Sequence, residues 1–90
     1  MSRTAINPAI LDQIFQEIED EFRSASENFP PFASEHEGYA VLLEEVDELW
    51  EAVKLNQKRN PNRQLLCQKE AKQVAAMAIR FLYDCYWRKP

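Results

Sequence analysis

The chain contains one glycine, Gly38, among its 90 residues. Glycine most readily supplies the backbone conformations of tight turns, so a chain with a single glycine has little room for hairpin turns or long irregular loops. Its apolar residues recur instead at the three- and four-residue spacing of amphipathic helices. The sequence therefore predicts an all-α fold. Its three main helices are expected at about residues 8–25, 35–56 and 61–86.

Start and stop signals divide these helices. The Asn-Pro pairs at 7–8 and 60–61 each read as an N-cap followed by proline at the first helical position. Ser34 and Glu37 have the spacing of a capping box, directly after a segment with two consecutive prolines. Gly38 falls on the apolar side of the second helix. There the absent side chain is expected to let another helix approach closely.

The length favours one domain, 1–90, with a thin core. A chain of this size buries only about 60–65% of its unfolded surface. We therefore expect the bundle to be completed by oligomerisation, as a homo-oligomer.

Several classes of protein do not fit the sequence. The longest apolar run, Val74 to Ile79, is far shorter than a membrane span, and the first residues lack the apolar stretch of a signal peptide. Cys67 and Cys85 stand 18 positions apart in one expected helix, or roughly 27 Å, too far for a disulfide. We expect reduced thiols, a cytoplasmic location and no membrane association.

Charge is divided unevenly along the chain. Residues 1–51 hold 13 acids against 2 arginines, and residues 52–90 hold 9 bases against 2 acids. The net charge of −4 disfavours nucleic-acid binding, and most of the basic residues are expected on the solvated surface.

Three acids lie on the apolar sides of their helices, where charged side chains are not expected. At about 100° per residue, Glu45 falls inside the apolar arc of the second helix and Glu48 at its edge. Glu70 lies in the middle of the apolar stripe of the third helix, with Gln73 and Asp84 on its shoulder. Burial of unpaired carboxylates is costly, and three together repel one another. Such acids need a basic partner or a cation.

Two explanations follow from that cost. Arg80 is the only well-placed base on the third helix, which leaves an excess of negative charge suited to Mg²⁺ or Mn²⁺. Alternatively, the bundle is purely structural, and its buried acids pair with Arg80 or with bases of another subunit. A third alternative is that the acids belong to a solvated helix face. The placement of the acids among apolar residues favours a metal site.

The same residues resemble a known family. "EEVDE", followed after 21 intervening residues by "EAKQVAAMAIRF", resembles the E-E-x-x-E and E-x-x-D motifs of the MazG-like all-α nucleoside triphosphate pyrophosphohydrolases. The segment "HEGYAVLLEEVDELWEAVK" looks like the small MazG-related proteins of bacteria and phages. The likeness covers roughly residues 29–84.

The resemblance implies an antiparallel helical bundle, assembled as a homodimer or homotetramer. It also implies Mg²⁺-dependent cleavage of a nucleoside triphosphate between its α and β phosphates. By position, the metal ligands would be Glu45, Glu48 and Glu70, and Glu44 would be the leading acid of the first motif. Gln73 stands where the family has aspartate. Its amide oxygen would still coordinate a metal, but without negative charge.

These matches give each residue an expected role. Glu44 would orient the attacking water, unless the metal holds that water, and Lys54 and Arg80 would contact the β and γ phosphates. Phe81 lies near the expected substrate, and Asp84 is a candidate to compensate for Gln73. Phe29 and Phe32, beside the prolines, are either base-stacking aromatics or part of the core or a subunit interface. The alternative function is a catalytically weakened member that binds nucleotides or a protein partner.

Overall fold

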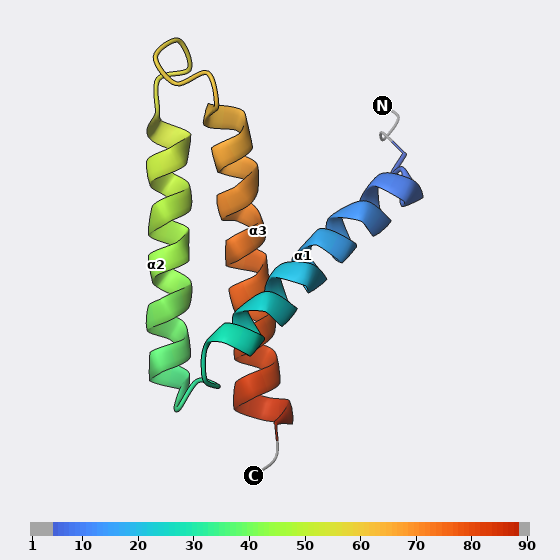
Figure 1. Ribbon diagram of the computed structural model, residues 1–90, viewed down its shortest axis with the longest axis vertical. Helices are drawn as coiled ribbons and strands as arrows, with labels where there is room; N and C mark the ends of the chain where they lie inside the picture. The colour runs from blue at the N-terminus through green and yellow to red at the C-terminus, as the bar shows by residue number, and fades with distance from the viewer. Residues whose placement is uncertain (1–4, 89–90) are drawn as a thin grey trace.

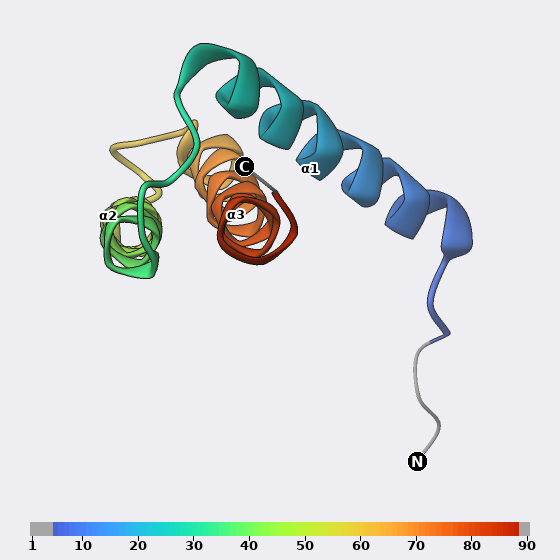
Figure 2. The ribbon, with the colours of Figure 1, turned by 90° about the horizontal axis from the view of Figure 1, so that it is seen from below.

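The computed structural model describes residues 5–88. Over that range, all regular secondary structure is helical. Helix α2 (Glu35–Lys54) and helix α3 (Arg63–Leu82) run antiparallel, side by side. Helix α1 (Pro8–Asn28) crosses α3 obliquely, so its N-terminal half projects away from the α2–α3 hairpin (Figures 1 and 2). A single π-helical turn, η1 (Tyr83–Trp87), follows α3. The prediction of an all-α fold with three main helices is confirmed.

The predicted caps are present at two of the three helix starts. The Asn7 side chain accepts hydrogen bonds from the backbone N–H groups of Ala9 and Ile10. Ser34 Oγ accepts from the N–H of Glu37, and the Glu37 carboxylate accepts from the N–H of Ala33 at 2.8 Å. These bonds satisfy N–H groups that the first turn of a helix leaves unpaired. The expected capping box therefore forms, although Glu37 reaches one residue further back than its usual partner.

The third helix begins later than predicted, and the second ends earlier. Leu55 has an extended backbone, and the Asn56 side chain accepts the N–H groups of Lys58 and Arg59, which holds the chain in a turn. Helix α3 then starts at Arg63, two residues after the expected proline. The Arg63 guanidinium donates to the Val53 carbonyl at 2.7 and 3.2 Å, and so caps the end of α2. These side-chain bonds to the backbone replace the extra helical turn that periodicity alone predicts.

The first helix runs three residues longer than predicted. It continues to Asn28, where the N–H of Phe29 still donates to the Ala25 carbonyl, and Pro30 follows. At the other end of the chain, the predicted helix to residue 86 divides into α3 and the π turn, in which the N–H of Arg88 donates to the Tyr83 carbonyl at 2.8 Å. The wider turn adds a residue per hydrogen-bonded ring, which a spacing of 3.6 residues cannot predict.

The core is small and lies where all three helices meet. Phe32, Ala76 and Met77 are buried at its centre. Gly38 is buried beside it, and a Cβ added there would lie 2.7 Å from a ring carbon of Phe81 and 3.0 Å from one of Phe32. The space beside Gly38 is therefore filled by the rings of Phe81, from α3, and Phe32, rather than by the backbone of a neighbouring helix. Partly buried apolar residues surround the centre: Ile18, Phe22, Ala25, Val41, Leu42, Phe81 and Cys85.

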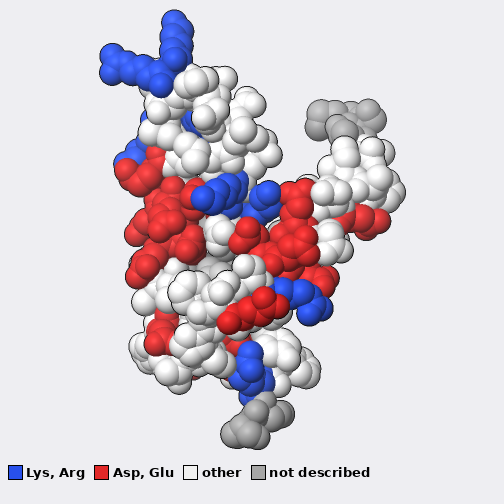
Figure 3. Space-filling model, viewed as in Figure 1, with Lys and Arg blue, Asp and Glu red and all other residues white. Residues whose placement is uncertain are grey.

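Many apolar side chains remain exposed, as expected for a short chain. The exposed ones near the start of α1 are Ile6, Ile10, Leu11, Ile14 and Phe15. Acidic side chains gather over α2 and over the region where α1 crosses α3 (Figure 3). Among the residues that the structure describes, no helix combines the length and the hydropathy that a membrane crossing requires.

Candidate functional site

Three carboxylates meet between α2 and α3. Glu45 and Glu48 lie one turn apart on α2, and Glu70 faces them from α3. One oxygen atom from each of the three lies within 4.8 Å of the other two. Glu45 and Glu70 are half-buried and Glu48 is exposed. The three acids that the apolar pattern singles out are therefore brought together by the antiparallel pairing of the two helices.

The negative charge of this carboxylate cluster is not balanced by bases. Burial raises the pKa of Glu45, and the nearby carboxylates of Glu48, Glu70 and Glu44 raise it further. Burial and the neighbouring Glu48 likewise raise the pKa of Glu70, although Lys69 opposes this shift. Within residues 5–88, no lysine or arginine forms an ion pair with any of the three. The cluster therefore holds excess negative charge.

One atom of the cluster lacks any protein partner. Glu70 Oε2 is buried and accepts no hydrogen bond from the described residues. Leaving a buried acceptor unsatisfied costs about 1–3 kcal/mol. Hard oxygen donors around a small gap are the ligands that Mg²⁺ and Mn²⁺ take in proteins. The donor set and the unpartnered oxygen both fit such a cation.

Gln73 lies next to the cluster and is tied to α1. Its amide nitrogen donates to Glu21 Oε2 at 2.7 Å, so its carbonyl oxygen is the atom left for a ligand. On the preceding residue, Lys72 pairs with Glu17 at 2.8 Å. Glu21 was not among the residues that the apolar pattern singled out. Its signal was present, since Glu21 is three residues after Ile18 and four before Ala25, both partly buried against the core.

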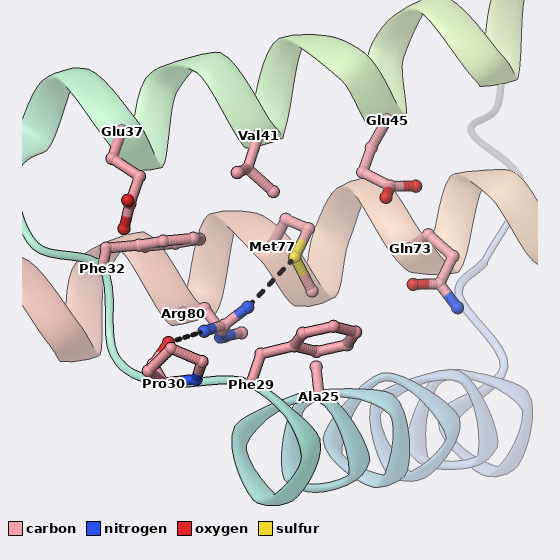
Figure 4. Close-up of a pocket in the computed structure, with 10 residues that line it drawn as sticks. All are labelled: Ala25, Phe29, Pro30, Phe32, Glu37, Val41, Glu45, Gln73, Met77 and Arg80. Carbon is pink, nitrogen blue, oxygen red and sulfur yellow. Dashed lines mark hydrogen bonds between the residues drawn. The ribbon is translucent and has the colours of Figure 1, made fainter.

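A cavity of about 370 Å³ adjoins the cluster. Figure 4 shows Glu37, Val41 and Glu45 reaching down from α2, with Gln73 and Met77 on α3 opposite. Glu45 thus lines the cavity and also belongs to the carboxylate cluster. The remaining lining residues come from the end of α1, the proline segment and α3: Ala25, Phe29, Pro30, Phe32 and Arg80.

Arg80 lies in the wall of this cavity, away from the carboxylate cluster. Its side chain is almost fully buried, and the Nη2 atom donates to the Pro30 carbonyl at 2.8 Å. Nη2 also lies 3.7 Å from Asp84 Oδ2, and the Phe32 ring stands over the guanidinium at 4.4 Å. The structural alternative in which Arg80 neutralises the three acids is therefore not the arrangement observed.

Asp84 is engaged on both of its oxygens. Oδ2 accepts the N–H of Phe32 at 3.1 Å and lies near Arg80, and Oδ1 lies 3.2 Å from Arg88 Nη2. Asp84 therefore links the segment around Pro30 and Phe32 to the π turn that follows α3. The structure does not bring it to the carboxylate cluster, where compensation for Gln73 would be needed.

The remaining candidates are dispersed. Lys54 pairs with Glu51 at 2.6 Å near the C-terminal end of α2, and its ammonium lies over the Trp50 ring. Phe81 packs against Gly38 rather than lining the cavity. Glu44 is exposed beside Glu45, near enough to raise its pKa.

Taken together, three carboxylates that could hold a cation lie next to a largely apolar cavity with a buried guanidinium in its wall. No family model, curated protein or solved structure matches the chain.

Proposed function

We propose that the protein is a Mg²⁺-dependent nucleoside triphosphate pyrophosphohydrolase of the MazG-like kind. It would cleave the bond between the α and β phosphates and release a monophosphate and pyrophosphate. The observation that carries the proposal is the meeting of Glu45, Glu48 and Glu70 within 4.8 Å, with a buried Glu70 oxygen that lacks a partner. Mn²⁺ would suit the same oxygen ligands.

Each residue has a role in the proposed reaction. Glu45, Glu48 and Glu70 would hold the cation, and the Gln73 carbonyl would be a neutral fourth ligand. A cation held there would supply positive charge to offset that of the phosphates and the charge that develops during transfer. Glu44 orients a water molecule and accepts its proton as the water oxygen bonds to the α-phosphorus. The bond from that phosphorus to the bridging oxygen breaks, and pyrophosphate leaves.

The other polar residues divide between the two ends of the substrate. Lys54, on the same helix as Glu45 and Glu48, is proposed to contact the β and γ phosphates. Arg80 lines the cavity, so its contact is proposed to be with the nucleoside rather than with the phosphates. Asp84 and Phe81 support that wall through Arg80 and Gly38, respectively.

Release of pyrophosphate from a panel of nucleoside triphosphates, with and without Mg²⁺, tests the proposal. We expect metal-dependent release with the monophosphate as co-product. Glu48→Gln should lower the rate on the order of 100-fold, because the cation loses a charged ligand. Asp47→Asn is the matched control, an exposed acid on the same helix outside the cluster. Normal turnover by Glu48→Gln would refute the assignment of the site.

Gln73 supports a second candidate, an oligomeric helical module that binds a nucleotide or a protein without turnover. The amide brings no charge, and its nitrogen is already bonded to Glu21. Nucleotide binding by folded protein without pyrophosphate release would favour this candidate. Gln73→Asp should then restore Mg²⁺-dependent release if the missing charge is the cause.

A homodimer or homotetramer in the cytoplasm is part of the proposal, as is the absence of nucleic-acid partners. The exposed apolar side chains on the projecting half of α1 support self-association, because monomeric proteins rarely leave large apolar patches open to water. Light scattering coupled to size-exclusion chromatography measures the mass in solution. Replacing Ile10 and Ile14, both exposed, with lysine should shift that mass toward the monomer.

A further inference from the structure

The cavity next to the carboxylate cluster has its own set of binding groups. At about 370 Å³ it falls in the size range of pockets that hold small ligands. Val41 and Met77 make apolar walls, and Phe29 from the end of α1 closes one side (Figure 4). Because Glu45 belongs both to this cavity and to the cluster, an occupant of the cavity would have its charged end beside the three acids.

Two aromatic rings line this cavity, and they differ in what covers them. Phe32 is buried and lies against the Arg80 guanidinium. Phe29 is 61% exposed although its neighbours on the cavity wall are apolar. An aromatic ring open to a cavity is a stacking surface for a planar ligand.

Arg80 provides hydrogen-bond donors that the protein does not use. It is only 3% exposed, and its one short bond to an oxygen is the 2.8 Å bond from Nη2 to Pro30. Among residues 5–88, Nη1 has only the Met77 sulfur, a weak acceptor, at 3.8 Å, and Nε has no partner. Figure 4 shows Nη1 pointing toward that sulfur. Since arginine has no acceptor atoms, a ligand must present an acceptor to it.

The opposite side of the cavity presents acceptors. Glu37 and Glu45 line it from α2, with the Glu37 carboxylate beside Phe32 (Figure 4), and the only side-chain hydrogen bond to that carboxylate from the described residues is the one from the N–H of Ala33. A ligand that fits is therefore planar, with acceptors on one edge and N–H donors on another. Guanine has both, with O6 and N7 as acceptors and N1–H and the 2-amino group as donors, and arginine is the side chain that most often binds O6 and N7. In the same orientation, adenine would place its 6-amino donor where guanine has the O6 acceptor.

We propose that this cavity binds the guanine base of a nucleotide, with Phe29 stacked on the ring, Arg80 Nη1 donating to its acceptor edge and Glu37 accepting from its donor edge. The proposal rests on the proposed function in one respect: it takes the triphosphate to lie at the carboxylate cluster. It extends that function by naming the class of base and the residues that select it.

The test is a titration of the full chain, labelled with ¹⁵N and in the presence of Mg²⁺, with guanosine 5′-monophosphate and separately with adenosine 5′-monophosphate. We expect amide shifts at Phe29, Phe32, Val41 and Met77, and about tenfold tighter binding of the guanine nucleotide. Replacing Arg80 would break its buried contact with Asp84 and destabilise the fold, so the variant is Phe29→Leu. It keeps an apolar side chain, and it should weaken guanine binding about tenfold through loss of stacking.

Phe15→Leu is the matched control, because Phe15 is 59% exposed on the same helix that leads to Phe29 but does not line this cavity. It should leave the affinity unchanged. Equal affinity for the two nucleotides, no shift with either, or unchanged binding by Phe29→Leu would each overturn the base site. Pyrophosphate release that ignores base identity and Phe29 would leave the hydrolase standing without the base site. Guanine binding without any release of pyrophosphate would support the base site and contradict the hydrolase.

Discussion

Helix α3 and the π turn that follows it hold buried charge in different ways. In the π turn, Asp84 accepts a hydrogen bond from the N–H of Phe32 and lies between Arg80 and Arg88. On α3, Glu70 meets two more carboxylates, and one of its buried oxygens has no partner among the described residues. Both oxygens of Asp84 therefore have partners, whereas no basic side chain within residues 5–88 forms an ion pair with the three clustered carboxylates.

The contrast separates structural charge from charge arranged for a ligand. A buried ion stabilises a fold only when its partners and hydrogen bonds are in place, as they are around Asp84. Carboxylates gathered without a base destabilise the metal-free protein, and a cation removes that cost. Four substitutions or conditions, from the largest expected effect to the smallest, test the contrast.

Asp84→Ala should have the largest effect on stability. It removes the carboxylate that pairs with two arginines and with the proline segment, and leaves Arg80 buried without its partner. We expect a loss of about 3–5 kcal/mol in the free energy of unfolding, measured by urea denaturation followed by circular dichroism. The exposed Asp47→Ala should change it by less than about 0.5 kcal/mol. Similar small losses for both variants would contradict a structural role for Asp84.

Mg²⁺ should stabilise the folded protein by binding to the carboxylate cluster. At a concentration ten times its dissociation constant, a cation that binds only the folded state adds about 1.4 kcal/mol. Thermal unfolding at pH 7 with and without Mg²⁺ measures the gain. Glu48→Gln should lose most of it and Asp47→Asn should keep it. A gain that survives Glu48→Gln would place the cation elsewhere.

Gly38→Ala tests the packing around Phe32, whose ring lies against Arg80. The added Cβ would lie 2.7 Å from a ring carbon of Phe81, so the ring must move. Overpacking costs about 1–3 kcal/mol, and the better helix propensity of alanine returns up to about 1 kcal/mol. We expect a net loss of roughly 1 kcal/mol in urea denaturation. Ala40→Gly, at an exposed position on the same helix, isolates the propensity effect.

The smallest effect is the pH dependence of the metal-free protein. Burial and neighbouring acids raise the pKa of Glu45 and of Glu70 in the folded state, so both bind protons more tightly there than in the unfolded chain. Their contribution favours folding at pH values below about 4.5 and is lost as the pH rises through their raised pKa values. Glu45→Gln should therefore stabilise the metal-free protein at pH 7 by about 0.5 kcal/mol. At pH 4 the difference in unfolding free energy between variant and wild type should vanish. A difference that stays constant with pH would argue against the raised pKa of Glu45.

The sequence predicted those parts of the site that depend on helical spacing. Glu45, Glu48 and Glu70 were recognisable because each interrupts an apolar arc, and antiparallel pairing of two helices brings such residues together. The cap at Ser34 followed from a local rule in the same way.

The parts that were missed depend on contacts between distant residues. Arg80 and Asp84 have the spacing of a helical ion pair, but their other bonds go to Pro30 and Phe32, about 50 residues away. No periodicity indicates which loop will fold over the end of a helix. The helix ends near residues 54 and 63 were misplaced because Asn56 and Arg63 bond to backbone groups across a turn.

From the oblique packing of α1, we expect the two parts of the site to have different lifetimes. All three clustered acids belong to the α2–α3 hairpin, whereas Ala25 and Phe29 close the cavity from the end of α1. A helix that packs along one side opens at a lower free energy than the hairpin it covers, and such local openings recur on timescales of microseconds to seconds. Each opening would dismantle the chamber while the carboxylates stay in register. A ligand held at both would therefore release its flat end first and its charged end last.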